Sequence, residues 1–205
     1  MNPYSVYDYL AYVIPGGTVL VATQLAFAGW PSSEPGNVGL VALLAAAFLV
    51  GHGTAALAAF FEPLVWRHRP GAPVSPLWGL EGPGGVYDSD EIEKIQGELA
   101  KRYGPGLGLK RLYQLAYTDL QQRGKDQRLL TLNSQIGFHR NSAAALAVAV
   151  VVQASAILAR REATGTWAVA SVYAAGVLVF AIRYKRYWRQ FGDNVIRGFR
   201  VLDPR

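Results

Sequence analysis

Four long apolar runs constrain this chain more than any other feature of its sequence. They hold 18, 29, 19 and 17 residues and are Val13–Trp30, Val38–Trp66, Asn141–Ala159 and Thr166–Ile182. A helix crosses the hydrocarbon core of a bilayer with about 20 mostly apolar residues, within a range of about 17 to 25. A water-soluble protein of 205 residues seldom carries four such runs. We therefore predict an all-α integral membrane protein with four spanning helices.

The charged residues lie almost entirely outside these runs, and the basic ones are unevenly spread. The segment Arg67–Arg140 carries eleven basic and eight acidic residues, and Arg183–Arg205 carries seven basic and two acidic ones. Basic residues near the ends of spans stay in the cytoplasm. Both segments are therefore predicted to be cytoplasmic, with both termini inside and the protein in the inner membrane. Arg160 and Arg161 oppose this orientation, but they are only two of the 20 basic residues.

The pattern divides the chain into four parts. A transmembrane hairpin over 1–66 precedes a cytoplasmic helical insert over 67–140, a second transmembrane hairpin over 141–182 and a basic amphipathic helix over 183–205. Pro15 predicts that the first spanning helix begins near it, because proline is tolerated in a first turn and is costly later. The alternative is a kinked or broken span that lines a cavity.

Three amphipathic helices are predicted within the insert. Asp88 and Glu91 have the spacing of a capping box, so the first helix should start there. The second runs over about 109–123 and ends at Gly124, and the third runs over about 126–140 and continues into the third span. An insert of this size buries little core by itself. We expect it to pack on the membrane helices, on itself or on a neighbouring subunit.

The tail after the fourth span is predicted to be a helix with one aromatic face and basic residues around it. The aromatic face recurs at steps of three or four and consists of Tyr184, Trp188, Phe191, Val195 and Phe199. Our preferred interpretation is an anchor on the anionic inner leaflet. A face that packs on the insert is the second interpretation, and nucleic-acid binding is the least favoured. The candidate lipid contacts are Arg183, Lys185, Arg186, Trp188 and Arg189.

Small residues recur every four positions in three of the spans, which lets helices approach closely in lipid. Such rows pack helices within one subunit or between subunits of an oligomer. The Ala-rich third span would also suit the central axis of an oligomer. The residues in these rows are Gly51, Ala55, Ala59, Ala145, Ala149, Ala170 and Ala174.

Polar side chains within the predicted spans are candidates for function, because they are costly in hydrocarbon. The main ones are Gln24, His52 and Gln153. His52 is either a neutral side chain hydrogen-bonded to Gln153 or Gln24, or a titrating group that gates or relays protons.

A second candidate site lies at the predicted inner boundary of the membrane. It consists of Glu62, His68, His139 and Arg140. The simpler interpretation is a salt bridge from Glu62 to Arg67 or Arg140. The alternative is a small site for a metal ion or a phosphate-bearing head group, although the spacing matches no metal-binding signature.

The chain has no Cys and none of the motifs that mark common catalytic centres, such as a phosphate-binding loop or a zinc-binding helix. We therefore expect no cofactor, no resident metal and no enzymatic activity. The favoured function is a homo-oligomeric channel, or a pore-forming or membrane-perturbing effector, gated through its cytoplasmic helices. The alternatives are a membrane enzyme or lipid-handling protein that uses the inner-boundary site, and a scaffold that recruits a cytoplasmic protein.

The layout of two spans, a helical insert, two spans and a basic-aromatic tail, with the segment Arg183–Phe191, resembles that of small four-span bacterial membrane proteins. This group includes the membrane effectors of anti-phage operons. The resemblance concerns the layout over most of the chain, and it assigns no functional residue. It implies a bacterial membrane protein with a role in anti-phage defence.

Overall fold

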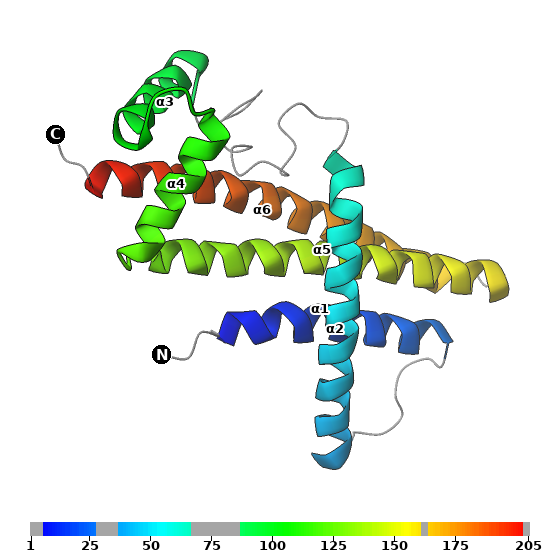
Figure 1. Cartoon of the computed structure of the whole chain (residues 1–205). Helices are drawn as coiled ribbons and strands as arrows, with labels where there is room; N and C mark the ends of the chain where they lie inside the picture. The colour runs from blue at the N-terminus through cyan, green and yellow to red at the C-terminus, as the bar shows by residue number, and fades with distance from the viewer. Residues whose placement is uncertain (1–5, 28–36, 67–86, 161–163, 203–205) are drawn as a thin grey trace. The chain divides into compact units, whose positions relative to one another are not determined.

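The computed structural model describes residues 6–27, 37–66, 87–160 and 164–202 (Figure 1). These residues form six α-helices and contain no strand. The helices are α1 Val6–Phe27, α2 Asn37–Trp66, α3 Ser89–Tyr103, α4 Leu109–Gln122, α5 Gln127–Arg160 and α6 Thr164–Leu202. The predicted all-α fold is therefore confirmed for the described part of the chain.

Four of the helices, α1, α2, α5 and α6, are long and apolar enough to cross a membrane. The qualifying stretches are Tyr9–Phe27, Gly39–Phe61, Gln127–Ala159 and Trp167–Leu202. Each of the four apolar runs in the sequence thus corresponds to one helix, and the prediction of four candidate spans is confirmed.

The chain divides into two compact units. Unit 1 contains Met1–Phe61 and Gly137–Tyr184, and unit 2 contains Glu62–Ile136 and Lys185–Arg205. α1 belongs to unit 1, and α3 and α4 belong to unit 2. α5 and α6 are unbroken helices that contribute residues to both units, so the third and fourth apolar runs continue as helix beyond their apolar parts.

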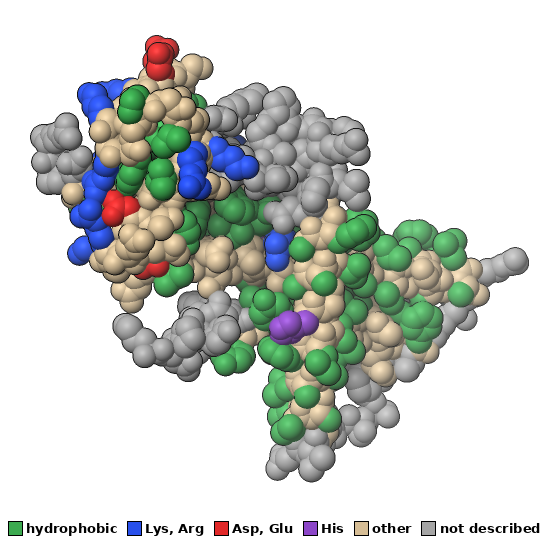
Figure 2. Space-filling model, in the orientation of Figure 1, with side chains coloured by type: hydrophobic (Ala, Val, Ile, Leu, Met, Phe, Trp, Pro, Cys, Tyr) green, Lys and Arg blue, Asp and Glu red, His purple; other side chains and the backbone are tan. Residues whose placement is uncertain are grey.

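Unit 1 buries small and polar side chains and exposes large apolar ones. The buried residues include many alanines of its helices and the polar Thr54, Asn141, Ser142 and Gln153. At least 64% of each of the following side chains is exposed: Val41, Leu49, Phe60, Val151, Leu158 and Val172. Figure 2 shows such hydrophobic side chains spread over the helices. Apolar exposure on this scale is unfavourable in water and favourable in hydrocarbon, so a bilayer is the solvent that suits unit 1.

Unit 2 has the opposite distribution, with large apolar side chains inside. Ile95, Leu99, Leu112, Leu120 and Ile196 are each at most 2% exposed. Most of its charged side chains lie on the surface, as in an ordinary water-soluble helical bundle. The two units are therefore built for two different solvents.

The ends of the two short helices follow the sequence signals. The Asp88 side chain accepts a hydrogen bond from the Glu91 backbone N–H, and the Glu91 carboxylate accepts one from the Asp88 N–H, so the predicted capping box is confirmed. α4 ends as predicted at Gly124, which has a φ of 64°. The Lys125 N–H donates to the Leu120 carbonyl, and the Gly124 N–H donates to that of Gln121. These two bonds form a Schellman motif, which needs a residue that tolerates positive φ.

Most of the aromatic face of the tail is buried, and Phe191 and Phe199 pack within unit 2. Phe191 lies 5.6 Å from Tyr117 of α4, and Phe199 lies 5.9 Å from Tyr103 of α3, measured between ring centroids. Tyr184, Phe191 and Phe199 are each at most 7% exposed. The preferred interpretation, in which the aromatic rings anchor the tail in lipid, is therefore wrong for Phe191 and Phe199, and lipid contact elsewhere on the tail stays a prediction. For these two rings the second interpretation, packing on the helices between the second and third spans, is confirmed.

The start of α1 also differs from the prediction. The helix begins at Val6 and continues through Pro15, so it does not start near the proline. A proline inside a helix leaves one carbonyl without its usual donor and needs compensation. That compensation comes from another helix.

Candidate functional site

Pro15 creates a local weakness in α1, and a side chain of α5 repairs it. Proline has no N–H, so the carbonyl of Ala11, four residues earlier, loses its helical partner. The Asn141 side-chain amide donates a hydrogen bond to this oxygen at 3.2 Å. Ala11, Pro15 and Asn141 are all buried. An unpaired carbonyl in such surroundings is costly, which explains why a polar amide is tolerated inside unit 1.

A second buried amide joins the same two helices. The side chain of Gln153 is 1% exposed, and its amide nitrogen donates to the carbonyl of Ala22 at 2.9 Å. The pairs Ala11–Asn141 and Ala22–Gln153 follow the same order along both helices, so α1 and α5 run parallel.

α1 and α2 meet at two glycines beside the proline. A Cβ atom added at Gly16 would lie 2.6 Å from the Gly51 nitrogen, and one added at Gly51 would lie 2.6 Å from the carbonyl carbon of Tyr12. α2 crosses α1 here (Figure 1). The backbones approach so closely that only glycine fits, which is the role of small residues at helix crossings in lipid. We call Ala11, Tyr12, Pro15, Gly16, Gly51, His52 and Asn141 the proline junction.

His52 lies on the exposed side of this junction. Its ring stacks on Tyr12 with a centroid distance of 4.0 Å, and its Nδ1 lies 3.0 Å from the Phe48 carbonyl oxygen. When Nδ1 carries the proton and donates it to that oxygen, Nε2 is the acceptor. Among the described residues, the predicted bond from His52 to Gln153 is not seen: Nδ1 of His52 faces the Phe48 carbonyl, and the Gln153 nitrogen donates to the carbonyl of Ala22. Gln24, the other predicted partner, is exposed on α1.

The small-residue rows have different surroundings. Ala145 and Ala149 of α5 are fully buried, and Ala170 of α6 is 7% exposed. The chain's own helices cover these residues, so the predicted use of the Ala-rich face as an oligomer axis is wrong for Ala145 and Ala149. The remaining members show mixed burial: Gly51 is buried, Ala55 is half-buried, and Ala59 and Ala174 are exposed.

Half of the predicted inner-boundary site can be placed. His139 is 5% exposed, and its ring lies 5.3 Å from that of Phe138 and 5.5 Å from that of Phe180. The Arg140 Nε donates to the Asn141 side-chain oxygen at 3.4 Å. The Glu62 side chain and the whole of His68 lie outside the described residues, so their proposed proximity to His139 and Arg140 stays a prediction. Within the described ranges, no three His, Asp or Glu side chains gather as a metal site would require.

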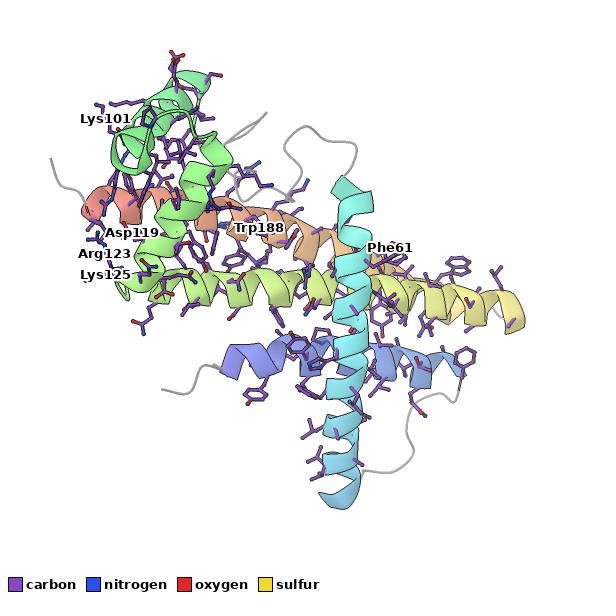
Figure 3. All side chains as sticks on the ribbon, in the orientation of Figure 1. Phe61, Lys101, Asp119, Arg123, Lys125 and Trp188 are labelled. Carbon is purple, nitrogen blue, oxygen red and sulfur yellow. The ribbon has the colours of Figure 1, made fainter. Side chains whose placement is uncertain are left out.

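Unit 2 contains a charged cluster around Asp119 of α4. The carboxylate accepts hydrogen bonds from Arg123 at 2.7 Å, from Arg102 at 2.8 Å and from the Tyr103 hydroxyl at 3.0 Å. Figure 3 shows Asp119 and Arg123 near the end of α4. The bond from Arg123, with the help of Tyr103 and Arg102, holds the pKa of Asp119 below its usual value. Burial and the bond to Asp119 raise the pKa of Tyr103 to about 12. The cluster ties α3 to α4 and fits a structural role.

Two further links tie α6 to the rest of unit 2. The Tyr87 hydroxyl donates to Asp193 at 2.6 Å, and Asp193 also pairs with Arg197 at 2.8 Å. Arg200 pairs with Glu98 of α3 at 2.9 Å. Burial, with the bond to Asp193, raises the pKa of Tyr87 to about 12.

Comparison with known proteins finds no family model that matches the chain, no similar curated protein and no similar solved structure. The functional argument therefore depends on the geometry of this chain.

Sequence reasoning missed Asn141 as a site residue and used it only as the start of the third run. Pro15 was the available signal. A proline within a membrane helix implies an unpaired carbonyl four residues earlier, and the few buried amides of neighbouring spans are the donors to test against it.

Proposed function

We propose that this protein is a gated, homo-oligomeric membrane protein, a channel or a membrane-perturbing effector, in which unit 2 controls the proline junction of α1. One observation carries the proposal. α5 is a single helix that supplies Leu129, Leu132 and Ile136 to the buried residues at its start and bonds the Ala11 carbonyl through Asn141 further along. A displacement of α5 would therefore act directly on the weakest point of α1.

Pro15 makes α1 a suitable moving part. A helix bends most easily where a backbone hydrogen bond is missing, and prolines are the commonest cause of such kinks. Asn141 holds the freed carbonyl in the present state. When α5 shifts or rotates, the bond to Ala11 breaks and α1 is free to bend. The crossing at Gly16 and Gly51 would transmit that bend to α2, because no side chain lies between the two backbones.

The orientation belongs to the same proposal. Eighteen of the 20 basic residues lie in the segments 67–140 and 183–205, and basic flanks stay in the cytoplasm. Unit 2 would then be a cytoplasmic receiver for a ligand or a partner protein, with both termini inside. Several copies belong to the proposal, because a water-filled path requires a ring of helices around it. The resemblance in layout makes anti-phage defence the first biological setting to examine.

The test compares two substitutions of buried amides in the full-length protein. Asn141→Leu removes the side-chain donor to the Ala11 carbonyl, whose helical donor is already missing. Gln153→Leu is the matched control, because the carbonyl of Ala22 keeps its place in an uninterrupted part of α1. We expect ion efflux from liposomes to differ from that of the natural protein in Asn141→Leu, and to change much less in Gln153→Leu.

Light scattering of the same preparations in nanodiscs gives the mass of the assembly. A discrete oligomer together with a selective effect of Asn141→Leu supports the proposal. A strict monomer without ion efflux in any of the three proteins would refute it. Equal effects of the two substitutions would remove the proline junction from the mechanism while leaving an oligomeric channel possible.

A further inference from the structure

The outer face of α6 changes character abruptly along its length. Residues at alternating steps of four and three share one face of a helix. The exposed stripe that follows these steps consists of Ala168, Val172, Ala175, Val179, Ile182, Arg186 and Arg189. Its first five members are apolar and its last two are arginines, with Arg183 exposed beside them.

The ends of the apolar part resemble the two interfaces of a bilayer. Trp167 is 52% exposed at the start of the stripe, where aromatic residues are common at the level of the head groups. Trp167–Ile182 spans about 24 Å at 1.5 Å per residue. The long stems of the arginines add apolar length to this stretch while their charged ends stay in water. The position after Ile182 is therefore where hydrocarbon would give way to phosphate.

Most of the aromatic face of the tail is covered by protein, and the opposite face is exposed. Phe191 and Phe199 pack on α4 and α3, so they do not face the lipid. Within the described part of the chain, neither Arg183 nor Arg186 forms an ion pair with a carboxylate. Asp193, the nearest acidic residue along α6, is bonded to Tyr87 and Arg197.

We propose that Arg183, Arg186 and Arg189 form a binding surface for the head groups of anionic phospholipids. Guanidinium groups donate paired hydrogen bonds to phosphate oxygens, and basic residues beside a span are attracted to an anionic leaflet. This mode of lipid contact differs from that of an amphipathic anchor, because the arginines touch the head groups and the aromatic rings hold α6 to unit 2. It does not depend on the proposed gating.

The test uses the full-length protein in nanodiscs that contain phosphatidylglycerol and phosphatidylcholine in equal parts. The protein is extracted in mild detergent, and the ratio of the two lipids that remain bound is measured by mass spectrometry. We expect phosphatidylglycerol to be enriched and the enrichment to fall with added salt. Replacing all three arginines by glutamine should reduce it, by about fivefold for each charge removed.

The control removes the same charge elsewhere, through Lys101→Gln, Lys110→Gln and Arg111→Gln, at exposed positions of α3 and α4. An equal loss of enrichment in this control would overturn the proposal, since net charge alone would then explain the preference. The absence of any enrichment in the natural protein would overturn it too. If the glutamine variant does not insert, the triple arginine-to-lysine variant and the single glutamine variants are measured, and unchanged lipid ratios in every single variant would again contradict the proposal.

Discussion

Replacing Gly51 with alanine should separate α1 from α2. The added Cβ would lie 2.6 Å from the carbonyl carbon of Tyr12 and closer still to its oxygen, whereas ordinary contacts begin at 3.4 Å. The neighbouring atoms are backbone on both sides, so no side chain can rotate away, and the helices must move apart by at least 0.8 Å. Overpacking of this kind costs about 1–3 kcal/mol.

Gly53 is a matched control on the same helix. An added Cβ there meets no atom within 4 Å, so Gly53→Ala should be neutral or stabilising. Alanine is favoured over glycine in a helix by about 1 kcal/mol, and both substitutions share this gain. Their difference in stability therefore isolates the crossing.

The measurement is the free energy of unfolding of the purified protein in mixed micelles, titrated with a denaturing detergent. We expect Gly51→Ala to unfold at a lower mole fraction of the denaturing detergent than Gly53→Ala. The same substitution should also separate the ring of His52 from that of Tyr12, on which it stacks. If the two variants unfold at the same mole fraction of detergent, the close crossing does not exist in the folded protein, and α2 is not part of the proline junction.

Three further predictions concern unit 2. The buried hydroxyl of Tyr113 has no hydrogen-bond partner within the described part of the chain, so Tyr113→Phe should raise the free energy of unfolding by about 1 kcal/mol. If thermal unfolding shows that the variant is less stable, the hydroxyl has a partner. Asp88→Ala removes the cap of α3 and should lower the free energy of unfolding by about 1 kcal/mol, as measured by thermal unfolding. Asp90→Ala is the control, because Asp90 lies in the first turn of α3 and is not its cap. The phenols of Tyr87 and Tyr103 titrate near pH 12 in the folded protein and near pH 10 when unfolded. Their raised pKa values add stability that is complete below pH 10 and is lost as the pH rises towards 12. The free energy of unfolding of Tyr103→Phe should therefore fall less between pH 10 and pH 12 than that of the natural protein.

The two units show how one sequence serves two solvents. In unit 1 the side chains that hold helices together are alanines, glycines and two amides, because a hydrophobic surface gains nothing by leaving lipid for a protein core. In unit 2 the same task falls to Leu99, Leu112 and Ile196, because burial of apolar area from water is favourable. α5 and α6 contain both patterns in succession, which is why each is longer than a span requires.

The pairings between helices were harder to foresee than the helices. Asn141 and Ala11 lie 130 positions apart in the chain, and nothing near either residue indicates the other. The aromatic face of the tail was recognised correctly from its spacing, but the sequence pattern is the same for a face that meets lipid and for one that meets protein. Only the positions of Tyr103 and Tyr117 separate the two cases.

Apart from the start of α1, the sequence by itself determined where the helices lie and where α3 and α4 begin and end. Apolar length, a capping box at Asp88 and a glycine at position 124 act within a few residues of the backbone, so their effect can be read locally. The tertiary structure alone decided which donor serves the carbonyl freed by Pro15 and which face of α6 is left exposed. A periodic pattern specifies that one face of a helix will be buried. Which segment packs on that face depends on contacts between residues far apart in the sequence, and these form only when the whole chain has folded.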